Sequence, residues 1–159
     1  MDKKNLNGMA IGENLINWMI ENIPSGSVIL ELGSGSGTKE LVKHYTVYSI
    51  EDDIKWVGHC NDSKYIYAPR VNGWYDVNKI KEGIPSNYDV ILIDGPYIPN
   101  GNRRGFLENI DLFDTDTIMI FDDTHAEKHK LLMEDVVKLT NKTIIESKYN
   151  NEKGFTVIK

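Results

Sequence analysis

The feature that most constrains this sequence is an apolar run that ends in three glycines at alternate positions. Residues 28–37 read Val-Ile-Leu-Glu-Leu-Gly-Ser-Gly-Ser-Gly, so Gly33, Gly35 and Gly37 directly follow a segment of strand character. Glycine lets a backbone approach a bound ligand closely and adopts backbone angles that other residues avoid. A strand, a glycine-rich turn and a helix, in that order, can form a cradle for a nucleotide. The glycines alone are a weak signal of nucleotide binding, so this interpretation depends on the other motifs in the sequence.

Short apolar runs alternate with segments of helical periodicity along the chain. This alternation predicts an α/β fold: a doubly wound, mostly parallel seven-stranded sheet with helices on both faces. The run at 88–93 is nearly continuous, which is typical of a central strand covered on both faces. The predicted strands are residues 27–32, 46–50, 65–68, 88–93, 117–121, 143–147 and 155–158, and the predicted helices are 11–23, 38–44, 54–59, 77–82, 106–113 and 125–139.

The last two predicted strands, 143–147 and 155–158, are separated by too few residues for a helical crossover. A connection that short requires an antiparallel hairpin, so we expect an antiparallel strand at the C-terminal end of the sheet. The sequence shows no internal repeat, low-complexity tract or linker. Its 159 residues suit a single domain over residues 1–159.

Charge and composition narrow the possible functions. The net charge is −6 and the pI is about 5.2, which argues against non-specific binding to nucleic acid, because such binding relies on a basic surface. The single Cys60 cannot form an internal disulfide. No stretch approaches the roughly 18 apolar residues that span a bilayer, and residues 1–7 lack the apolar core of a signal peptide. We therefore expect a cytoplasmic protein without a membrane span.

Four segments, taken together, resemble the class I S-adenosylmethionine-dependent methyltransferases. In that family a glycine motif follows the first strand, an acid ends the second strand, another acid ends the fourth, and the seventh strand runs antiparallel to the rest. The corresponding segments here are residues 31–37, 49–51, 92–96 and 155–158, in the same order. The resemblance covers essentially the whole chain and implies S-adenosylmethionine as the cofactor.

A dinucleotide-binding Rossmann domain is the main alternative. Its fingerprint has a final glycine three positions after the second one. That position is Thr38 here, and Gly37 stands one residue earlier. Rossmann sheets also lack the terminal hairpin, so the order of the motifs favours the methyltransferase fold.

The resemblance implies roles for the residues of the glycine turn. The backbone of Gly33, Ser34, Gly35 and Gly37 would approach the methionine moiety of the cofactor. A tight strand-to-helix turn without a ligand is the alternative. Glu31 would lie near the cofactor's amino group or would hold the turn through backbone N–H groups, since a carboxylate suits either position.

Two further positions would contact the nucleoside part of the cofactor. Glu51 follows the second strand and, by resemblance, would accept both ribose hydroxyls. Asp52 and Asp53 are assigned instead to the start of the next helix, whose positive end favours negative charge. Trp74 and Tyr75 follow the third strand, where an aromatic face can stack on adenine, and buried packing is the alternative for both.

Acidic residues end two neighbouring strands and predict a polar rim at one edge of the sheet. Asp94 ends the central strand, Asp122 and Asp123 end the next one, and His125 follows closely. Crowded like charges are costly unless they share a cation or a proton, and Mg²⁺ prefers such oxygen ligands. Catechol-type O-methyltransferases bind Mg²⁺ with an aspartate and an Asp-Asn pair at the matching places, although Asp123 replaces the asparagine here. The resemblance thus implies a Mg²⁺ site formed by these three aspartates.

Helix capping is the alternative interpretation of the same segment. Thr124 and Glu127 fit the Ser/Thr-x-x-Glu capping box, which is compatible with outward-pointing aspartates. His125 would then lie in the first helical turn. A neutral His125, or Asp94, could take a proton from the methyl acceptor as a general base. Simple surface placement is the alternative for His125.

The resemblance implies methyl transfer to a small-molecule acceptor, at a hydroxyl oxygen. The acceptor pocket would be built from residues 5–14 and 96–105, and the second subunit of a homodimer could close it. Arg103 and Arg104 lie in the second of these segments and suit planar recognition of a carboxylate or phosphate. A solvated loop or an interface contact is the favoured interpretation of both arginines.

Two other functions stay open at this point. Residues 94–97 read Asp-Gly-Pro-Tyr, which is similar to the Asp-Pro-Pro-Tyr motif of amino-methyltransferases that act on nucleic acids or proteins. Gly95 breaks that motif, and the acidic pI disfavours a polynucleotide. A non-catalytic domain that only binds the cofactor, or serves as a scaffold, would keep the glycine turn and lack an acceptor pocket.

Overall fold

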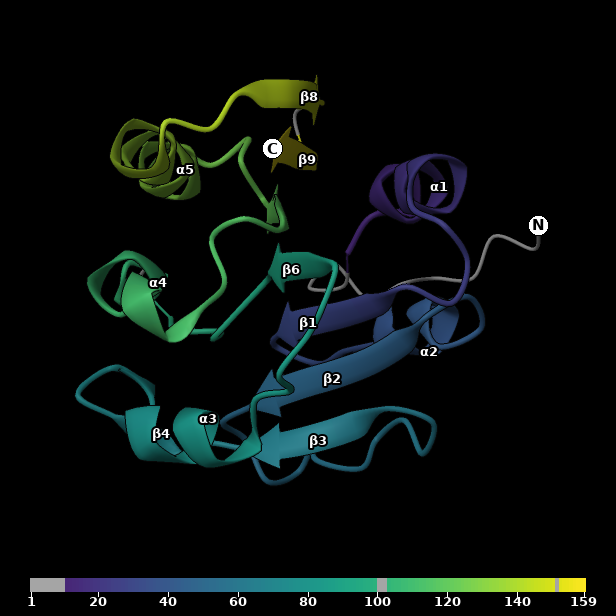
Figure 1. The fold of residues 1–159 in the computed structure, drawn as a ribbon, viewed down its shortest axis with the longest axis vertical. Helices are drawn as coiled ribbons and strands as arrows, with labels where there is room; N and C mark the ends of the chain where they lie inside the picture. Colours follow the sequence, from purple (N-terminus) through teal and green to yellow (C-terminus); the bar gives the residue numbers. More distant parts are fainter. Residues whose placement is uncertain (1–10, 100–102, 151) are drawn as a thin grey trace.

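Seven strands form one sheet in the computed structural model, which describes residues 11–99, 103–150 and 152–159. Their order across the sheet is β3-β2-β1-β6-β7-β9-β8 (Figure 1). Pairing is parallel from β3 to β7, and β9 is antiparallel to both of its neighbours. The predicted fold class is therefore confirmed. The strands are β1 (Val28–Leu32), β2 (Thr46–Glu51), β3 (Lys64–Tyr67), β6 (Val90–Ile93), β7 (Ile118–Asp122), β8 (Ile144–Tyr149) and β9 (Gly154–Ile158).

Helices cover both faces of this sheet (Figure 1). One face carries α1 (Glu13–Asn22) and α2 (Thr38–Leu41), and the other carries α3 (Val77–Gly83), α4 (Gly105–Glu108), the short 3-10 helix η1 (Ile110–Leu112) and α5 (Glu127–Thr140). Successive residues of a strand point to opposite faces. Accordingly Ile29 belongs to the apolar cluster under α1, whereas Leu30 and Leu32 belong to the cluster under α3 to α5. Glu31 therefore points to the same face as Ile29.

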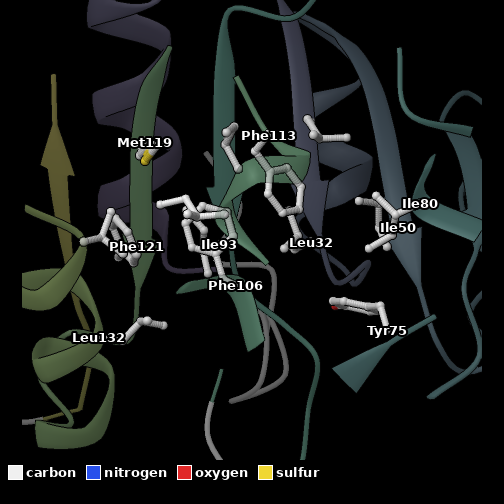
Figure 2. Packing of buried hydrophobic residues seen from close by; sticks show 14 of the residues in the cluster. Leu32, Ile50, Tyr75, Ile80, Ile93, Phe106, Phe113, Met119, Phe121 and Leu132 are labelled. Carbon is white, nitrogen blue, oxygen red and sulfur yellow. The ribbon is translucent and has the colours of Figure 1, made fainter. Parts of the chain in front are cut away.

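The larger apolar cluster fills the space between the sheet and α3 to α5. Figure 2 shows Leu32, Ile93 and Phe121, from three strands of the sheet, in the same cluster as Phe106 of α4 and Leu132 of α5. Each of these side chains is at most 1% exposed. Burying a side chain of this size stabilises a fold by about 1.5–3 kcal/mol. This packing fixes the carboxyl ends of the strands, where the polar residues of interest lie.

Several predicted helices differ from the structure. Residues 38–44 contain only the shorter α2, and residues 106–113 are divided between α4 and η1. Residues 54–58 form consecutive turns rather than a helix. The side chain of Asp53 accepts a hydrogen bond of 3.0 Å from the N–H of Lys55 within these turns. Helix α5 begins at Glu127, two residues later than expected. The reason is that Asp123 adopts a left-handed backbone conformation, with φ of 60°, so the chain turns once more after β7 before the helix can begin.

The predicted capping box of Thr124 and Glu127 is wrong. The N-cap of α5 is Ala126, which provides no side-chain cap, and His125 lies before the helix rather than in its first turn. The Thr124 hydroxyl forms a hydrogen bond of 3.0 Å with the Thr156 hydroxyl in β9 instead. The segment that follows β7 is thus tied to β9, because β9 is the strand that pairs with β7.

A small hairpin was not predicted. Strands β4 (Arg70–Val71) and β5 (Trp74–Tyr75) pair in antiparallel fashion and stand apart from the main sheet. Asn72 and Gly73 connect them with φ angles of 52° and 82°. Positive φ at both central residues is the geometry that Asn-Gly favours in two-residue hairpin loops, so the signal was present in the sequence.

None of the helices in the described ranges combines the length and the apolar character needed to cross a bilayer. The expectation about a signal peptide in residues 1–7, and the contribution of residues 5–10 and 100–102 to an acceptor pocket, lie outside the described residues.

Candidate functional site

The glycine turn leaves β1 at the point where the strand order reverses. The chain runs from β1 to β2 and β3 on one side and then returns to β6 on the other side of β1. Ligands of open α/β sheets bind at such switch points, beyond the carboxyl ends of the strands. Gly33 has a φ of 91°, and a Cβ added to it would lie 3.1 Å from both the carbonyl oxygen of Asp94 and the Cα of Gly95. Only glycine fits this backbone-to-backbone contact.

The other two glycines serve different purposes. A Cβ added to Gly35 would meet no described atom within 4 Å, so the backbone of Gly35 faces open space. A side chain at Gly37 would instead overlap Ile11, which packs closely against it. The turn therefore combines one position fixed by β6, one that is accessible to a ligand, and one fixed by the segment that precedes α1.

Glu31 supports the turn from below, through hydroxyl groups. Its buried carboxylate accepts hydrogen bonds from Ser49 Oγ at 2.5 Å and from Thr38 Oγ1 at 2.9 Å. Thr38 Oγ1 also accepts the N–H of Gly35 at 3.0 Å, so Glu31 holds the turn through Thr38 and not through direct backbone bonds. Burial raises the pKa of Glu31 to about 8, and the hydrogen bonds from Ser49 and Thr38 offset part of that rise.

Glu51 contacts the same turn from the end of β2. Its two carboxylate oxygens accept three backbone N–H groups, those of Ser34, Asp52 and Asp53, each at 2.9 Å. Burial raises the pKa of Glu51, and the backbone hydrogen bonds from Asp53 and Ser34 counteract the rise. The residue that was predicted to bind ribose thus also anchors the glycine turn to β2.

The structure places Trp74 in the core. Its side chain is 5% exposed, and its ring contacts the rings of Tyr75 and Phe113 edge-on, with centroids 5.3 and 6.3 Å apart. Buried packing, the alternative to stacking on adenine, is therefore what the structure shows for Trp74. The hydroxyl of Tyr75 is buried beside Gly95, where a side chain at position 95 would overlap it, and it has no hydrogen-bond partner among the described residues.

A second acidic group lies at the ends of β6 and β7, and we call it the aspartate cluster: Asp94, Asp122 and Asp123. One carboxylate oxygen of each residue lies within 4.8 Å of the others. Arg103, only 7% exposed, reaches into the cluster. Its Nη2 lies 3.0 Å from Asp123 Oδ2 and 3.4 Å from Asp94 Oδ1, and its Nη1 donates to the carbonyl oxygen of Asp122 at 3.1 Å. The expectation of a solvated Arg103 is corrected by these contacts.

The three aspartates differ in how the surroundings affect their pKa values. Burial, and then the negative charge of Asp122, raise the pKa of Asp94 well above its ordinary value. Burial, and then Asp123, raise the pKa of Asp122 to about 6. Partial burial works in the same direction on Asp123, but the positive charges of Arg103 and Lys153 outweigh it and lower the pKa of Asp123. The ionised member that pairs with the cations is thus Asp123.

The two histidines near this cluster occupy different positions. His125 is exposed, in the turn that precedes α5. His129, one helical turn further along, is partly buried, and its Nδ1 has no hydrogen-bond partner among the described residues. Burial lowers the pKa of His129 to about 4, with the charge of Arg103 acting in the same direction. The general-base role of His125 stays a prediction.

A pocket opens beside the aspartate cluster, between the start of α1 and the β8–β9 hairpin. Asp122 lines it, together with Asn14, Lys148, Tyr149 and Lys153. Of the predicted acceptor-pocket segments, residues 12–14 contribute to this pocket. Neither lysine was singled out in the sequence, because isolated lysines in a predicted hairpin carry no pattern that distinguishes them from solvated surface residues.

Comparison with solved structures gives the fold a clear precedent. A methyltransferase from Pyrococcus furiosus is 18% identical, with a TM-score of 0.61 over 91% of this chain and 80% of that chain. The E. cuniculi Mtq2–Trm112 complex, responsible for methylation of the eRF1 translation termination factor, gives 17% identity and a TM-score of 0.57, over 94% of each chain. Magnesium protoporphyrin IX methyltransferase from Synechocystis, with bound SAM, gives 11% identity and a TM-score of 0.58, over 92% of this chain and 77% of that chain.

No protein-family profile matches the sequence, and no curated protein sequence gives a significant match. Identities of 11–18% establish a shared fold and nothing finer. The chain therefore has the fold of class I S-adenosylmethionine-dependent methyltransferases, including the antiparallel strand β9.

Proposed function

We propose that this protein is an S-adenosylmethionine-dependent methyltransferase. The observation that carries the proposal is the glycine turn at the switch point of the sheet, with Gly35 facing open space. Glu51 at the end of β2 and Asp94 at the end of β6 flank this turn on either side. A ligand with an amino acid part, a ribose and a charged sulfur would meet backbone donors at the turn, a carboxylate on one side and the aspartate cluster on the other.

The cofactor contacts that we propose follow from the hydrogen bonds that Glu31 and Glu51 form within the protein. The backbone of Gly33, Ser34, Gly35 and Gly37 surrounds the methionine part. A carboxylate has about four acceptor sites, and backbone N–H groups use three of those on Glu51. The remaining site accepts a ribose hydroxyl. Glu31 acts from beneath the turn, through Thr38, and sets the position of the turn without touching the cofactor.

The chemistry requires few groups. The acceptor attacks the methyl carbon in line, the C–S bond breaks, and its electron pair stays on sulfur. The acceptor's proton passes to Asp122, which lines the pocket beside Asp94 and whose pKa burial raises to about 6, a value that suits a general base near neutral pH. Holding the two reactants in line and away from water supplies most of the rate enhancement. The acceptor we propose is a small molecule with a hydroxyl group, which the pocket lined by Asp122 receives.

The aspartate cluster meets the spacing that a divalent ion needs, but Arg103 already supplies a cation there. Its guanidinium lies 3.0 Å from Asp123 Oδ2 and 3.4 Å from Asp94 Oδ1, so it contacts two of the three carboxylates that an ion would bind. A buried guanidinium and Mg²⁺ on the same carboxylates would repel each other. These residues therefore do not fit Mg²⁺ while Arg103 is in place, and we propose a reaction that needs no metal.

Calorimetry with S-adenosylhomocysteine and S-adenosylmethionine tests the proposed function directly. The wild-type protein should bind both, and Glu51→Ala should weaken the affinity about tenfold or more, since a hydrogen bond to a charged group is lost. Glu82→Ala is the matched control, because Glu82 is an exposed glutamate that pairs only with Lys79 among the described residues. Wild-type protein that binds neither compound would overturn the proposal.

Loss of the Ser34, Asp52 and Asp53 contacts could also loosen the turn in Glu51→Ala. Glu51→Gln keeps one carbonyl oxygen and the shape of the side chain, so urea unfolding of both variants separates the two effects. Unchanged affinity in Glu51→Ala would show that this carboxylate does not bind the ribose.

A further inference from the structure

The pocket beside the aspartate cluster is built from segments that are far apart in the sequence. Strand β9 is antiparallel to β7, and Asp122 pairs with Phe155, so the start of β9 and the end of β8 lie at the carboxyl edge of the sheet. The first turn of α1 reaches the same edge from the face that it covers, and Gly12 and Lys153 both line the pocket there. The pocket therefore lies between a helix start, a hairpin end and the carboxylates of the proposed active site.

The start of α1 presents to this pocket two backbone N–H groups that have no acceptor among the described residues. Gly12 is the N-cap and provides no side-chain cap, and the first intrahelical bonds come from the N–H groups of Leu15 and Ile16. The N–H groups of Glu13 and Asn14 thus have no intrahelical acceptor. A helix start with free N–H groups and a positive dipole end attracts anions.

Two lysines line the same pocket. Lys148 is exposed at the end of β8. The aliphatic stem of Lys153 packs on the N-cap of α1, 3.9 Å from a Cβ added to Gly12. Its ammonium lies 3.7 Å from Asp123 Oδ1, a loose ion pair that holds the charge between the helix start and the aspartate cluster.

The floor of the pocket offers a hydrogen-bond acceptor instead of positive charge. Asp122 lines it, is 2% exposed, and its Oδ2 has no hydrogen-bond partner among the described residues. A buried acceptor atom without a donor costs about 1–3 kcal/mol, so a ligand O–H or N–H at this point would be favoured. The pocket thus offers positive groups on its wall and a single hydrogen-bond acceptor at its floor.

One negative charge opposes an anion here. Glu13 also lines the pocket, from the first turn of α1. Its side chain is exposed and can turn towards water, so it weakens anion binding without preventing it.

We infer that the methyl acceptor carries an acidic group, a carboxylate or a phosphate, in addition to its hydroxyl. This inference rests on the proposed function. The acidic group binds the N–H groups at the start of α1 together with Lys148 and Lys153, and the hydroxyl donates to Asp122 beside the transferred methyl group. Two separate anchor points, one for the acidic group and one for the hydroxyl, orient the acceptor.

Nuclear magnetic resonance of the full-length ¹⁵N-labelled protein tests the inference, with sodium acetate and inorganic phosphate as probes. Both titrations are done with and without S-adenosylhomocysteine. At least one anion should shift the amide signals of Glu13 and Asn14, and the tighter of the two identifies the acidic group. Lys148→Gln and Lys153→Gln should each weaken that binding about tenfold, whereas Glu13→Gln should strengthen it about threefold.

Lys138→Gln is the matched control, since Lys138 is an exposed lysine on α5 whose partner is Asp135. Its affinity for either anion should equal that of the wild type. The inference is overturned if neither anion moves the two amides, or if the pocket lysines behave like Lys138. Binding of S-adenosylhomocysteine without binding of either anion refutes the acidic acceptor and leaves the proposed function intact. Anion binding without S-adenosylhomocysteine binding refutes both, because the pocket would then serve no acceptor.

Discussion

Two acidic groups flank the switch point of the sheet, and the protein stabilises them in opposite ways. Within the described part of the chain, Glu31 and Glu51, on the β1–β2 side, accept hydrogen bonds from neutral donors alone, namely hydroxyls and backbone N–H groups. The aspartate cluster, on the β6–β7 side, is held by the cation of Arg103 and by Lys153. Carboxylates at the same edge of the sheet are thus stabilised by neutral donors on one side and by positively charged side chains on the other.

The difference has a physical consequence for function. Neutral donors on β2 and in the glycine turn fix the geometry of the turn, which suits binding of a cofactor in one orientation. Charged groups lie beside Asp94 and Asp123, where the proposed reaction moves a proton. Under the proposed function, the β1–β2 side positions the cofactor and the β6–β7 side takes part in the reaction.

Replacing Arg103 should change the unfolding free energy the most, because Arg103 is the buried cation of the aspartate cluster. Arg103→Met leaves three crowded carboxylates without their buried cation, and the loss of such a partner typically costs about 3–5 kcal/mol of unfolding free energy. The pKa values of Asp94 and Asp122 are raised, so both take up protons as the pH falls and the repulsion decreases. Urea unfolding should show a larger loss at about pH 8 than at about pH 5.

Arg104→Met is the matched control for that measurement. Arg104 pairs with Asp135 at 2.8 Å, and both side chains are more than a third exposed, at 37% and 38%. Exposed ion pairs contribute less than about 1 kcal/mol. Equal losses in the two arginine variants would show that the aspartate cluster does not depend on Arg103.

The next prediction concerns Glu31, on the β1–β2 side of the switch point, and the way in which it makes the unfolding free energy depend on pH. In the folded protein the pKa of Glu31 is about 8, whereas in the unfolded chain it is near its ordinary value of 4.5. The folded state therefore keeps a proton that the unfolded state loses, so the contribution of Glu31 to stability is complete below about pH 4.5 and falls as the pH rises to about 8. Glu31→Gln cannot titrate and lacks this decline.

As the pH rises between those values, the wild type should therefore lose on the order of 4 kcal/mol more unfolding free energy than Glu31→Gln. Measurements in urea at several pH values give the difference directly, and effects of other titrating groups cancel. Parallel pH profiles would mean that the hydroxyls of Ser49 and Thr38 keep Glu31 ionised.

A smaller effect is expected at Gly33, and a contrast at Gly35. Gly33→Ala places a side chain at φ of 91° and against the backbone of Asp94, which should cost about 1–3 kcal/mol. Gly35→Ala meets no described atom, so stability should change by less than about 1 kcal/mol while cofactor affinity falls about tenfold. Urea unfolding measures the change in stability of each variant, and calorimetry measures the change in cofactor affinity. Full cofactor affinity in Gly35→Ala would contradict the proposed approach of the cofactor to this residue.

The smallest expected effect is that of magnesium. Because Arg103 provides the positive charge at the aspartate cluster, removal of divalent ions with a chelator should change affinity for S-adenosylhomocysteine, and methyl transfer, by less than about twofold. A tenfold gain on adding Mg²⁺ would show that the ion displaces Arg103, and would restore the metal site that the resemblance implies.

The fold could be predicted from local signals, and the site only in part. Continuous apolar runs identify central strands, and the short connection before β9 requires a hairpin, so the sheet follows from the sequence alone. The turn at Gly33 and the acids at positions 51 and 94 were also found, because each lies at the end of a recognisable strand.

The contacts that complete the site depend on tertiary packing. Arg103 and Arg104 are neighbours with equal sequence signals, yet Arg103 is buried against the aspartate cluster, whereas Arg104 pairs with the half-exposed Asp135 of α5. The capping box failed for a similar reason, since Thr156 of β9 competes for the Thr124 hydroxyl. Pairings between residues distant in sequence decide such cases, and no local pattern records them.

The close fit of Gly33 against the residues that follow β6 has a final consequence. With no side chain between them, the two main-chain segments touch, so neither can shift by even a fraction of an ångström without moving its neighbour. In the enzyme that we propose, a nucleoside held by the first segment and an acceptor beside the second would therefore affect each other's affinity, and by the same factor in both directions.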